Sequence, residues 1–265
     1  MSRIDAVFKQ AGRKALITYV TVGYPSVEAT LKVVPFMADH GCDIVELGIP
    51  FSDPLADGAT IQRASHNALQ NGVTPRLCLE VARELSAKVN NPLVFMTYLN
   101  PVLSYGFEAF CTACAQSGVS GLIIPDLPPE EGSELEAISQ RQGIDLIYLL
   151  APTSTTERIG LLAQRSRGFI YLVSLTGVTG VRDSLPPDLD AFVSRVRGIT
   201  SKPLCVGFGI STPEQARQAA RTADGVIIGS RIIQLMEADE SFGPLGSFIK
   251  EVRSSLDELA PERKQ

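Results

Sequence analysis

The stretch DIVELGIPFSDPLADG, residues 43–58, combines a short apolar strand with an acidic, proline-containing loop. The run 43–47 has the apolar character expected of a strand that is buried on both faces of a parallel sheet. Glu46 stands near the end of this strand, Asp57 follows eleven residues later, and a helix is expected to begin near Ala59. A core strand that leads through a loop into a helix is the building unit of an α/β fold.

The same unit repeats along the chain. Short apolar runs predict strands at 15–21, 43–47, 93–97, 121–124, 145–149, 170–174, 203–207 and 225–229. Segments with helical periodicity lie between them, and several begin with a capping residue; helices are expected at 27–39, 74–88, 107–116, 130–141, 157–167, 189–196, 213–221 and 231–237. Eight strands alternating with helices predict an α/β fold with a single (β/α)8 TIM barrel domain over residues 1–265. An extra N-terminal helix and a C-terminal helix at 247–259 complete this prediction.

The alternative architecture is an open, doubly wound parallel sheet. Such sheets that bind dinucleotides carry the motif G-x-G-x-x-G after their first strand. Residues 21–25 read TVGYP at that position. The barrel is therefore favoured.

Composition narrows the class of protein. A net charge of −5 argues against nucleic-acid binding and fits a soluble enzyme, and no apolar run approaches the ~18 residues of a membrane span. The odd count of five cysteines favours reduced thiols and a cytoplasmic location. Cys111 and Cys114 form a C-x-x-C pattern within an expected helix, where a structural role is favoured over redox or metal chemistry.

Barrel active sites lie at the carboxyl ends of the strands, and phosphate is often bound after strands 7 and 8. Gly207 and Gly209 follow the seventh expected strand, and Gly229 and Ser230 open a short helix after the eighth. Free backbone N–H groups and the helix dipole would suit an anion there. The alternative is that the glycines only form a tight turn and Ser230 only caps the helix, but the joint occurrence in both loops favours a phosphate site.

The two carboxylates of the opening stretch are candidates for acid–base chemistry. Alternation along the strand places Ile44 and Glu46 on one face, so Glu46 would lie against apolar side chains at the barrel mouth, where burial raises a carboxyl pKa. The alternative is an exposed glutamate paired with a surface base, and this strand alone does not decide between them. For Asp57, capping of the following helix is a rival role, and for Asp53 ordinary turn chemistry is at least as good an interpretation.

Other chemistries lack the residues that they need. None of the lysines follows an expected strand, which argues against a Schiff base at the barrel mouth. His40 and His66 are the only histidines and fall on helices, so no metal site is expected. The long loop 175–187 is expected to act as a lid rather than as a disordered connector.

Several motifs together resemble one known family. ELGIPFSDPLADG at 46–58, YLNP at 98–101, IPDLP at 124–128, GVTG at 177–180 and GFGIS at 207–211 are similar to the signatures of the tryptophan synthase alpha chain family, over residues 15–233. The resemblance implies a lyase that splits indole-3-glycerol phosphate into indole and glyceraldehyde 3-phosphate by retro-aldol cleavage. Two rivals are another phosphate-binding barrel, such as an isomerase or epimerase, and a non-catalytic barrel that only binds a partner or a phosphate ligand. The shortage of histidine and of mouth-facing lysine opposes the first, and the presence of Glu46 and Asp57 opposes the second.

The resemblance also assigns roles to residues. It implies that Glu46 protonates indole C3 and takes the proton of the glycerol 3′-hydroxyl, while Asp57 binds the indole N–H and stabilises the cationic indolenine. Tyr171 matches a catalytic-site tyrosine, and Thr179 matches a lid residue that closes onto Asp57. Phosphate binding is implied for Gly180, Gly209, Gly229 and Ser230, and an indole pocket for Tyr19, Met96, Ile123, Leu149 and Phe208. Tyr19 and Leu175 depart from the phenylalanine and arginine that are frequent in the family.

The family resemblance further implies a partner. It predicts a hetero-tetramer of two alpha and two beta chains, in which the beta chain carries pyridoxal phosphate and receives indole. No cofactor is expected in this chain, and neither nucleic acid nor membrane is an expected partner. The loop 52–59, the segment 100–101 and the lid are the implied contact surfaces.

Overall fold

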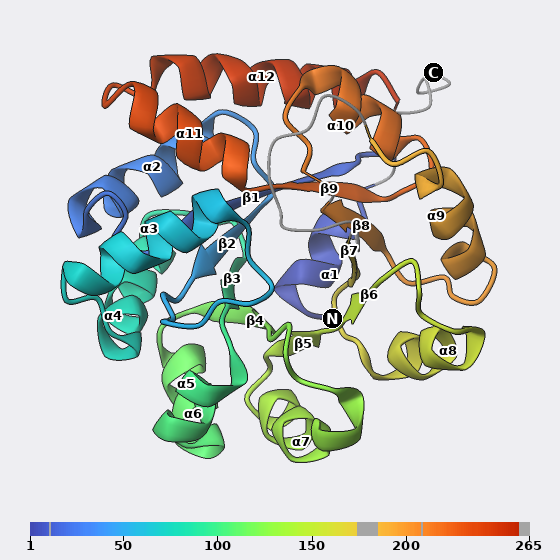
Figure 1. Ribbon diagram of the computed structural model, residues 1–265, viewed down its shortest axis with the longest axis horizontal. Helices are drawn as coiled ribbons and strands as arrows, with labels where there is room; N and C mark the ends of the chain where they lie inside the picture. The colour runs from blue at the N-terminus through green and yellow to red at the C-terminus, as the bar shows by residue number, and fades with distance from the viewer. Residues whose placement is uncertain (11, 174–184, 208, 260–265) are drawn as a thin grey trace.

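The computed structural model describes residues 1–10, 12–173, 185–207 and 209–259. Parallel strands form one sheet at the centre of the molecule, and the helices surround it (Figure 1). The strands are β1 (Ala15–Thr21), β2 (Ile44–Gly48), β3 (Leu93–Met96), β4 (Val119–Ile123), β5 (Asp145–Ile147), β6 (Leu149–Leu150), β7 (Ile170–Val173), β8 (Leu204–Gly207) and β9 (Gly225–Ile228). Their order in the sheet is β5-β4-β3-β2-β1-β9-β8-β7-β6.

The two end strands of this order, β5 and β6, are consecutive in sequence, so the sheet closes into a barrel. They correspond to the single strand expected at 145–149, interrupted at Tyr148. The amide of Tyr148 donates to Ser166 Oγ at 3.1 Å, while its carbonyl accepts from the amide of Tyr171 at 3.0 Å. β5 pairs with β4 and β6 pairs with β7, so the interrupted strand spans the gap between them. The predicted eight-stranded barrel is confirmed.

The helices form the outer layer of the barrel. They are α1 (Arg3–Phe8), α2 (Val27–Asp39), α3 (Ala59–Gln70), α4 (Pro75–Ser86), α5 (Leu99–Tyr105), α6 (Phe107–Gln116), the 3-10 helix η1 (Pro129–Glu131), α7 (Ser133–Arg141), α8 (Thr156–Arg165), α9 (Leu189–Arg197), α10 (Pro213–Ala220), α11 (Ser230–Ala238) and α12 (Gly243–Asp257). The helix α5 was not expected, and it accommodates Pro101 in its first turn, where no intrahelical N–H bond is lost. The C-terminal helix begins at Gly243 rather than at residue 247, again with a proline in the first turn.

Two apolar layers hold the barrel together. The larger lies between the strands and the helices and includes Val45 and Leu47, whereas Ile44 belongs to a second cluster inside the barrel. This confirms the alternation expected for β2. Ile4 of α1 is fully buried in the inner cluster, and in Figure 1 this helix lies within the ring of strands. A Cβ atom on Gly121 would come within 2.8 Å of the Ile4 side chain, so α1 fits closely into the amino-terminal end of the barrel.

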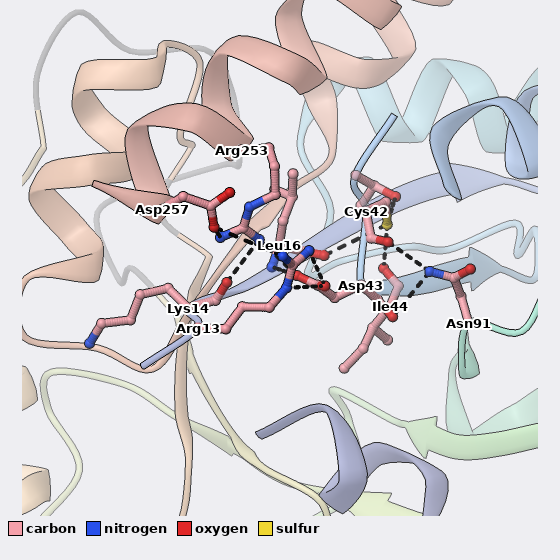
Figure 2. A network of polar contacts seen from close by, with 10 residues as sticks. Arg13, Lys14, Leu16, Cys42, Asp43, Ile44, Asn91, Arg253 and Asp257 are labelled. Atoms are coloured by element: carbon pink, nitrogen blue, oxygen red, sulfur yellow. Dashed lines mark hydrogen bonds and ion pairs between the residues drawn. The ribbon is translucent and has the colours of Figure 1, made fainter. Parts of the chain in front are cut away.

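A polar network around Asp43 fixes the amino-terminal end of β2 (Figure 2). The Asp43 carboxylate accepts from the amide of Leu16 at 2.8 Å, from Arg13 Nε at 2.9 Å and from an Arg253 guanidinium nitrogen at 2.9 Å. Arg253 also forms an ion pair with Asp257. The network therefore connects β1, β2 and α12 at the end of the barrel opposite the strand carboxyl termini.

The cysteines lie in the core of the barrel and its helices. All five cysteines are buried and unpaired, and burial raises the pKa of the Cys111 thiol to about 11, which suits a structural role for the C-x-x-C pair. In the described ranges, no group of three or more His, Cys, Asp or Glu side chains could hold a metal ion. Within those same ranges, no helix combines the length and apolar character needed to cross a membrane.

Candidate active site

A cavity of about 550 Å³ opens at the carboxyl ends of the strands. Ten of the residues predicted from the sequence line it: Tyr19, Glu46, Asp57, Met96, Leu149, Tyr171, Gly207, Gly209, Gly229 and Ser230. They come from β1, β2, β3, β6, β7 and β8, from the loops after β2, β8 and β9, and from the first residue of α11. The barrel closure thus brings together residues that are far apart in the sequence.

Glu46 lies in β2 beside Tyr19 of β1 and Val94 of β3, and its side chain points to the inside of the barrel. It is 0% exposed, and neither carboxylate oxygen has a hydrogen-bond partner in the described part of the chain. Burial raises the pKa of Glu46 from 4.5 to about 8, because the charged form loses its hydration without gaining a donor. Glu46 is therefore mostly protonated near neutral pH. The alternative of an exposed, paired glutamate is wrong.

Asp57 lies in the loop between β2 and α3 and is 7% exposed. The Tyr98 hydroxyl donates to Asp57 Oδ2 at 3.1 Å and accepts from the amide of Ala56 at 3.0 Å. Burial raises the pKa of Asp57 to about 6, and the hydrogen bond from Tyr98 opposes this rise because it favours the charged form. The N-cap residue of α3 is Gly58, so helix capping by Asp57 is wrong.

Asp53 behaves as the turn interpretation expected. Its carboxylate is exposed and accepts a hydrogen bond from the neighbouring Ser52 hydroxyl at 2.6 Å. Its carbonyl accepts from the amide of Leu55 at 2.9 Å, which tightens the loop locally. Asp53 is absent from the lining of the cavity. The two loop aspartates thus have different environments, and only Asp57 faces the cavity.

Two tyrosines flank the carboxylates, each packed over a glycine of the neighbouring strand. A Cβ atom on Gly48 would come within 2.0 Å of the Tyr19 hydroxyl oxygen, and one on Gly207 within 2.6 Å of the Tyr171 hydroxyl oxygen. The absent side chains make room for the rings. Burial raises the pKa of both phenols further from neutrality, and nearby carboxylates add to the rise, so both tyrosines remain hydrogen-bond donors.

The part of the cavity lined by the loops after β8 and β9 has the features of an anion site. Gly209 adopts a φ of 69°, a left-handed conformation that suits glycine, and Gly229 is the N-cap residue of α11. Ser230 is the first helical residue of α11 and not its N-cap, so the simple capping alternative is wrong. The first N–H groups of a helix have no intrahelical acceptor and lie at the positive end of its dipole. This turn therefore presents donors to a ligand in the cavity.

Some predicted residues are placed elsewhere. Ile123 is fully buried in the inner apolar cluster and is absent from the cavity lining, although its register partner Met96 lines the cavity. Phe208, Thr179 and Gly180 lie outside the described residues, as do Leu175 and most of the expected lid.

The cavity also contains residues that the sequence analysis missed. Ile61 of α3, Ser154 and Arg158 around the start of α8, and Arg231 of α11 contribute to its lining. Arg231 directly follows Ser230, and Ser154 follows the fifth strand. Both therefore lie in the regions after barrel strands where active-site residues are expected. Ile61 and Arg158 lie inside helices, where no sequence signal separates a cavity-lining side chain from a surface one.

Comparisons with known proteins agree with this architecture. The family model for the tryptophan synthase alpha chain matches residues 6–253. The tryptophan synthase alpha chain of Dehalococcoides mccartyi is 58% identical over 257 residues, covering 97% of this chain and 100% of that one, and the alpha chain of Geobacter sp. (strain M21) is 47% identical over 262 residues, covering 97% and 98%.

Solved structures give the same result. A chain in a structure of Mycobacterium tuberculosis tryptophan synthase superposes with a TM-score of 0.91 at 39% identity, covering 97% of this chain and 98% of that one. The alpha subunit from Legionella pneumophila str. Paris superposes with a TM-score of 0.89 at 36% identity, covering 97% and 99%. On these matches, over nearly its whole length, the chain belongs to the tryptophan synthase alpha chain family.

Proposed function

We propose that Glu46 and Asp57 divide the chemistry of a single retro-aldol cleavage between them. As a member of its family, the chain is a lyase that cleaves indole-3-glycerol phosphate to indole in tryptophan biosynthesis. The observation that carries the assignment of residues is the pair of buried carboxylates at one cavity. Glu46 has no partner among the described residues and a pKa raised to about 8, whereas Asp57 accepts a hydrogen bond and has a pKa of about 6. Near pH 7 the first is mostly an acid and the second mostly a carboxylate.

Glu46 serves first as an acid and then as a base. Its protonated carboxyl donates a proton to indole C3, which converts the ring into an indolenine cation. The resulting carboxylate then accepts the proton of the hydroxyl on the carbon bonded to C3. That carbon becomes the aldehyde of glyceraldehyde 3-phosphate as the carbon–carbon bond breaks, and the bonding electrons return to the ring. Glu46 ends the cycle protonated, so no external proton donor is required.

Asp57 stabilises the cation that Glu46 creates. Its carboxylate, itself only 7% exposed, accepts the indole N–H and lowers the free energy of the positively charged indolenine. The Tyr98 hydroxyl keeps this carboxylate oriented and favours its charged form. Tyr171 lies near Glu46, and its protonated phenol is a further donor beside the reacting carbons.

The remaining lining residues bind the two ends of the substrate. Met96, Leu149, Tyr19 and Ile61 give the cavity apolar walls for the indole ring. Gly209, Gly229 and Ser230 provide backbone N–H groups and a hydroxyl for the phosphate, and Gly180 is assigned to the same site from the family pattern. Thr179 is assigned to the lid on the same basis.

The partner assignment is also a proposal. We expect two copies of this chain to bind two beta chains that carry pyridoxal phosphate and receive indole, because a solved relative is a tryptophan synthase. Leu55, at 92% exposure, stands on the loop that supplies Asp57 and is a suitable apolar contact for such a partner. Five reduced cysteines fit a cytoplasmic location.

The deciding experiment measures indole release from indole-3-glycerol phosphate by the wild type and by Glu46→Gln, each with a beta chain supplied. The proposal expects release by the wild type and none above background by the folded variant. Equal release by both would refute the role of Glu46. Substrate binding without release by the wild type would instead favour the non-catalytic barrel.

A further inference from the structure

Arg231 occupies the first turn of α11, directly after Ser230, and contributes to the lining of the same cavity. Its Nε atom is buried and has no hydrogen-bond partner among the described residues, although the side chain as a whole is only partly buried. Across the part of the chain that the structure describes, its guanidinium forms none of the ion pairs. A buried guanidinium donor without an acceptor is costly unless a ligand supplies one.

The position of this side chain is fixed by helix geometry and by α12. Helical side chains lean toward the N-terminus of their helix, so a residue in the first turn of α11 reaches toward the end that faces the cavity. The Arg231 guanidinium carbon lies 5.8 Å from the centre of the Phe248 ring in α12. Contact with an aromatic face leaves the N–H groups in the guanidinium plane free to donate. The contact with Phe248 therefore holds Arg231 without using its Nε donor, which has no partner in the described part of the chain.

The expected ligand carries more negative charge than the backbone groups of this site compensate. A phosphate monoester carries about −1.5 to −2 charges at neutral pH, whereas the N-terminus of a helix supplies the equivalent of only about +0.5. The other arginine that lines the cavity, Arg158, is already bonded to Glu130 at 2.5 Å. Glu46 and Asp57 contribute no positive charge. Backbone donors alone would leave most of the phosphate charge uncompensated.

We propose that Arg231 supplies the positive charge of the phosphate subsite and donates from its guanidinium to the phosphate oxygens. This inference rests on the proposed function, in which the substrate phosphate lies against Gly209, Gly229 and Ser230. It adds a side-chain cation to a site otherwise made of backbone groups and a hydroxyl. Arg231 binds the non-reacting end of the substrate, so it contributes to affinity and orientation rather than to proton transfer.

The test measures the affinity of the chain for sn-glycerol 3-phosphate by calorimetry, with indole as an uncharged probe of the other end of the cavity. Arg231→Gln removes the charge, and Arg231→Lys retains it. Arg217→Gln is the matched control, because Arg217 lies on the neighbouring helix α10, pairs with Glu258 of the α12 C-cap at 3.1 Å and is absent from the cavity lining. We expect Arg231→Gln to weaken glycerol 3-phosphate binding by about tenfold or more, since a hydrogen bond to a charged group has at least that value. Indole affinity should not change.

A pH series separates a charge contact from a structural role. The second phosphate pKa is about 6, so the wild type should prefer the dianion and bind more tightly as the pH rises from 5 to 8. Arg231→Gln should lose much of this preference, and Arg231→Lys should keep it. If Arg231→Gln does not fold, Arg231→Met replaces it, because methionine keeps an unbranched stem beside Phe248.

Two results would overturn the inference. One is unchanged affinity in Arg231→Gln, and the other is an equal loss in Arg217→Gln, which would indicate only the general charge of the protein. The proposed function is judged separately, by indole release from the wild type. A chain that needs Arg231 for glycerol 3-phosphate but releases no indole would keep the phosphate contact and reject the lyase mechanism.

Discussion

Replacing Glu46 with glutamine should stabilise the folded chain, and increasingly so at higher pH. The carboxyl is fully buried, and its pKa is raised from 4.5 to about 8. Below pH 4.5 it is protonated in both the folded and the unfolded state. Between pH 4.5 and pH 8 the unfolded chain releases a proton that the folded chain keeps, so the free energy of unfolding falls as the pH rises. Glutamine cannot ionise, so the free energy of unfolding of the variant does not fall with pH for this reason.

The size of the effect follows from the two pKa values. Each unit of difference corresponds to 1.36 kcal/mol, so burial of Glu46 lowers the free energy of unfolding by about 4 kcal/mol at pH 8 but by less than about 1 kcal/mol at pH 5. The buried glutamine amide has its own unsatisfied groups, but their cost does not depend on pH. The stability difference between Glu46→Gln and the wild type should therefore grow by about 3 kcal/mol between these pH values.

Urea unfolding followed by circular dichroism, at pH 5 and at pH 8, measures this difference directly. Glu80→Gln is the matched control, because Glu80 is exposed on α4 and water hydrates its carboxylate in both states. That variant should show the same stability difference at both pH values. Equal differences for Glu46→Gln at pH 5 and pH 8 would refute the argument that an unpartnered, ionisable carboxyl is buried at this site.

The other predictions concern Asp57, its hydrogen bond and the opposite end of the barrel. Asp57→Asn should lower kcat for indole release by about two orders of magnitude or more, because the amide supplies no charge to the indolenine; a loss below tenfold would contradict its role. The wild-type profile of kcat/KM against pH should be bell-shaped, falling below about pH 6 as Asp57 is protonated and above about pH 8 as Glu46 loses its proton. Tyr98→Phe should move the acidic limb of that profile upward by about one pH unit, since it removes the hydrogen bond that favours the Asp57 carboxylate, and an unmoved limb would show that the bond has no such effect. Asp43→Asn should lower the free energy of unfolding by about 3 kcal/mol in urea, while leaving the KM for indole-3-glycerol phosphate unchanged.

The fold was predictable because its signal is repeated. Each strand of the barrel is a short apolar run buried on both faces, and each helix has its own periodicity and cap, so an error at one element does not change the architecture. Local departures depended on tertiary contacts. The sequence of residues 145–149 does not predict that the strand is interrupted at Tyr148, whose amide donates to Ser166 Oγ. Pro101 and Pro244 obscured the starts of α5 and α12, because a proline in a first turn and a proline in a loop look alike in sequence.

The residues of the site were predictable where their position in or just after a barrel strand determines that they face the cavity. Glu46 and Asp57 follow from the barrel geometry and from the family pattern, but the sequence could not exclude surface pairing for one or helix capping for the other. The burial of Glu46 excludes surface pairing, and the N-cap of α3 is Gly58, one residue after Asp57, which excludes capping by Asp57. The sequence did not predict Arg231 as a cavity residue, because the direction of a long side chain depends on the residues that pack beside it. Here that residue is Phe248.

Asp43 directly precedes β2 and Glu46 is the central residue of that strand, and together they show how the barrel separates stability from chemistry. Asp43 accepts from a backbone amide and two guanidinium groups, so its charge is compensated and its replacement should weaken the fold. Glu46 is more deeply buried and has no donor among the described residues, so its charge is penalised and its replacement should strengthen the fold. Loss of stability of this kind is common at functional sites, and the proposed chemistry of Glu46 accounts for it here. An acid that gives up a proton and recovers it within one reaction needs a pKa near neutrality. A hydrogen-bond donor or cation beside the Glu46 carboxylate would lower its pKa, and Glu46 would then be a poor acid for protonating carbon.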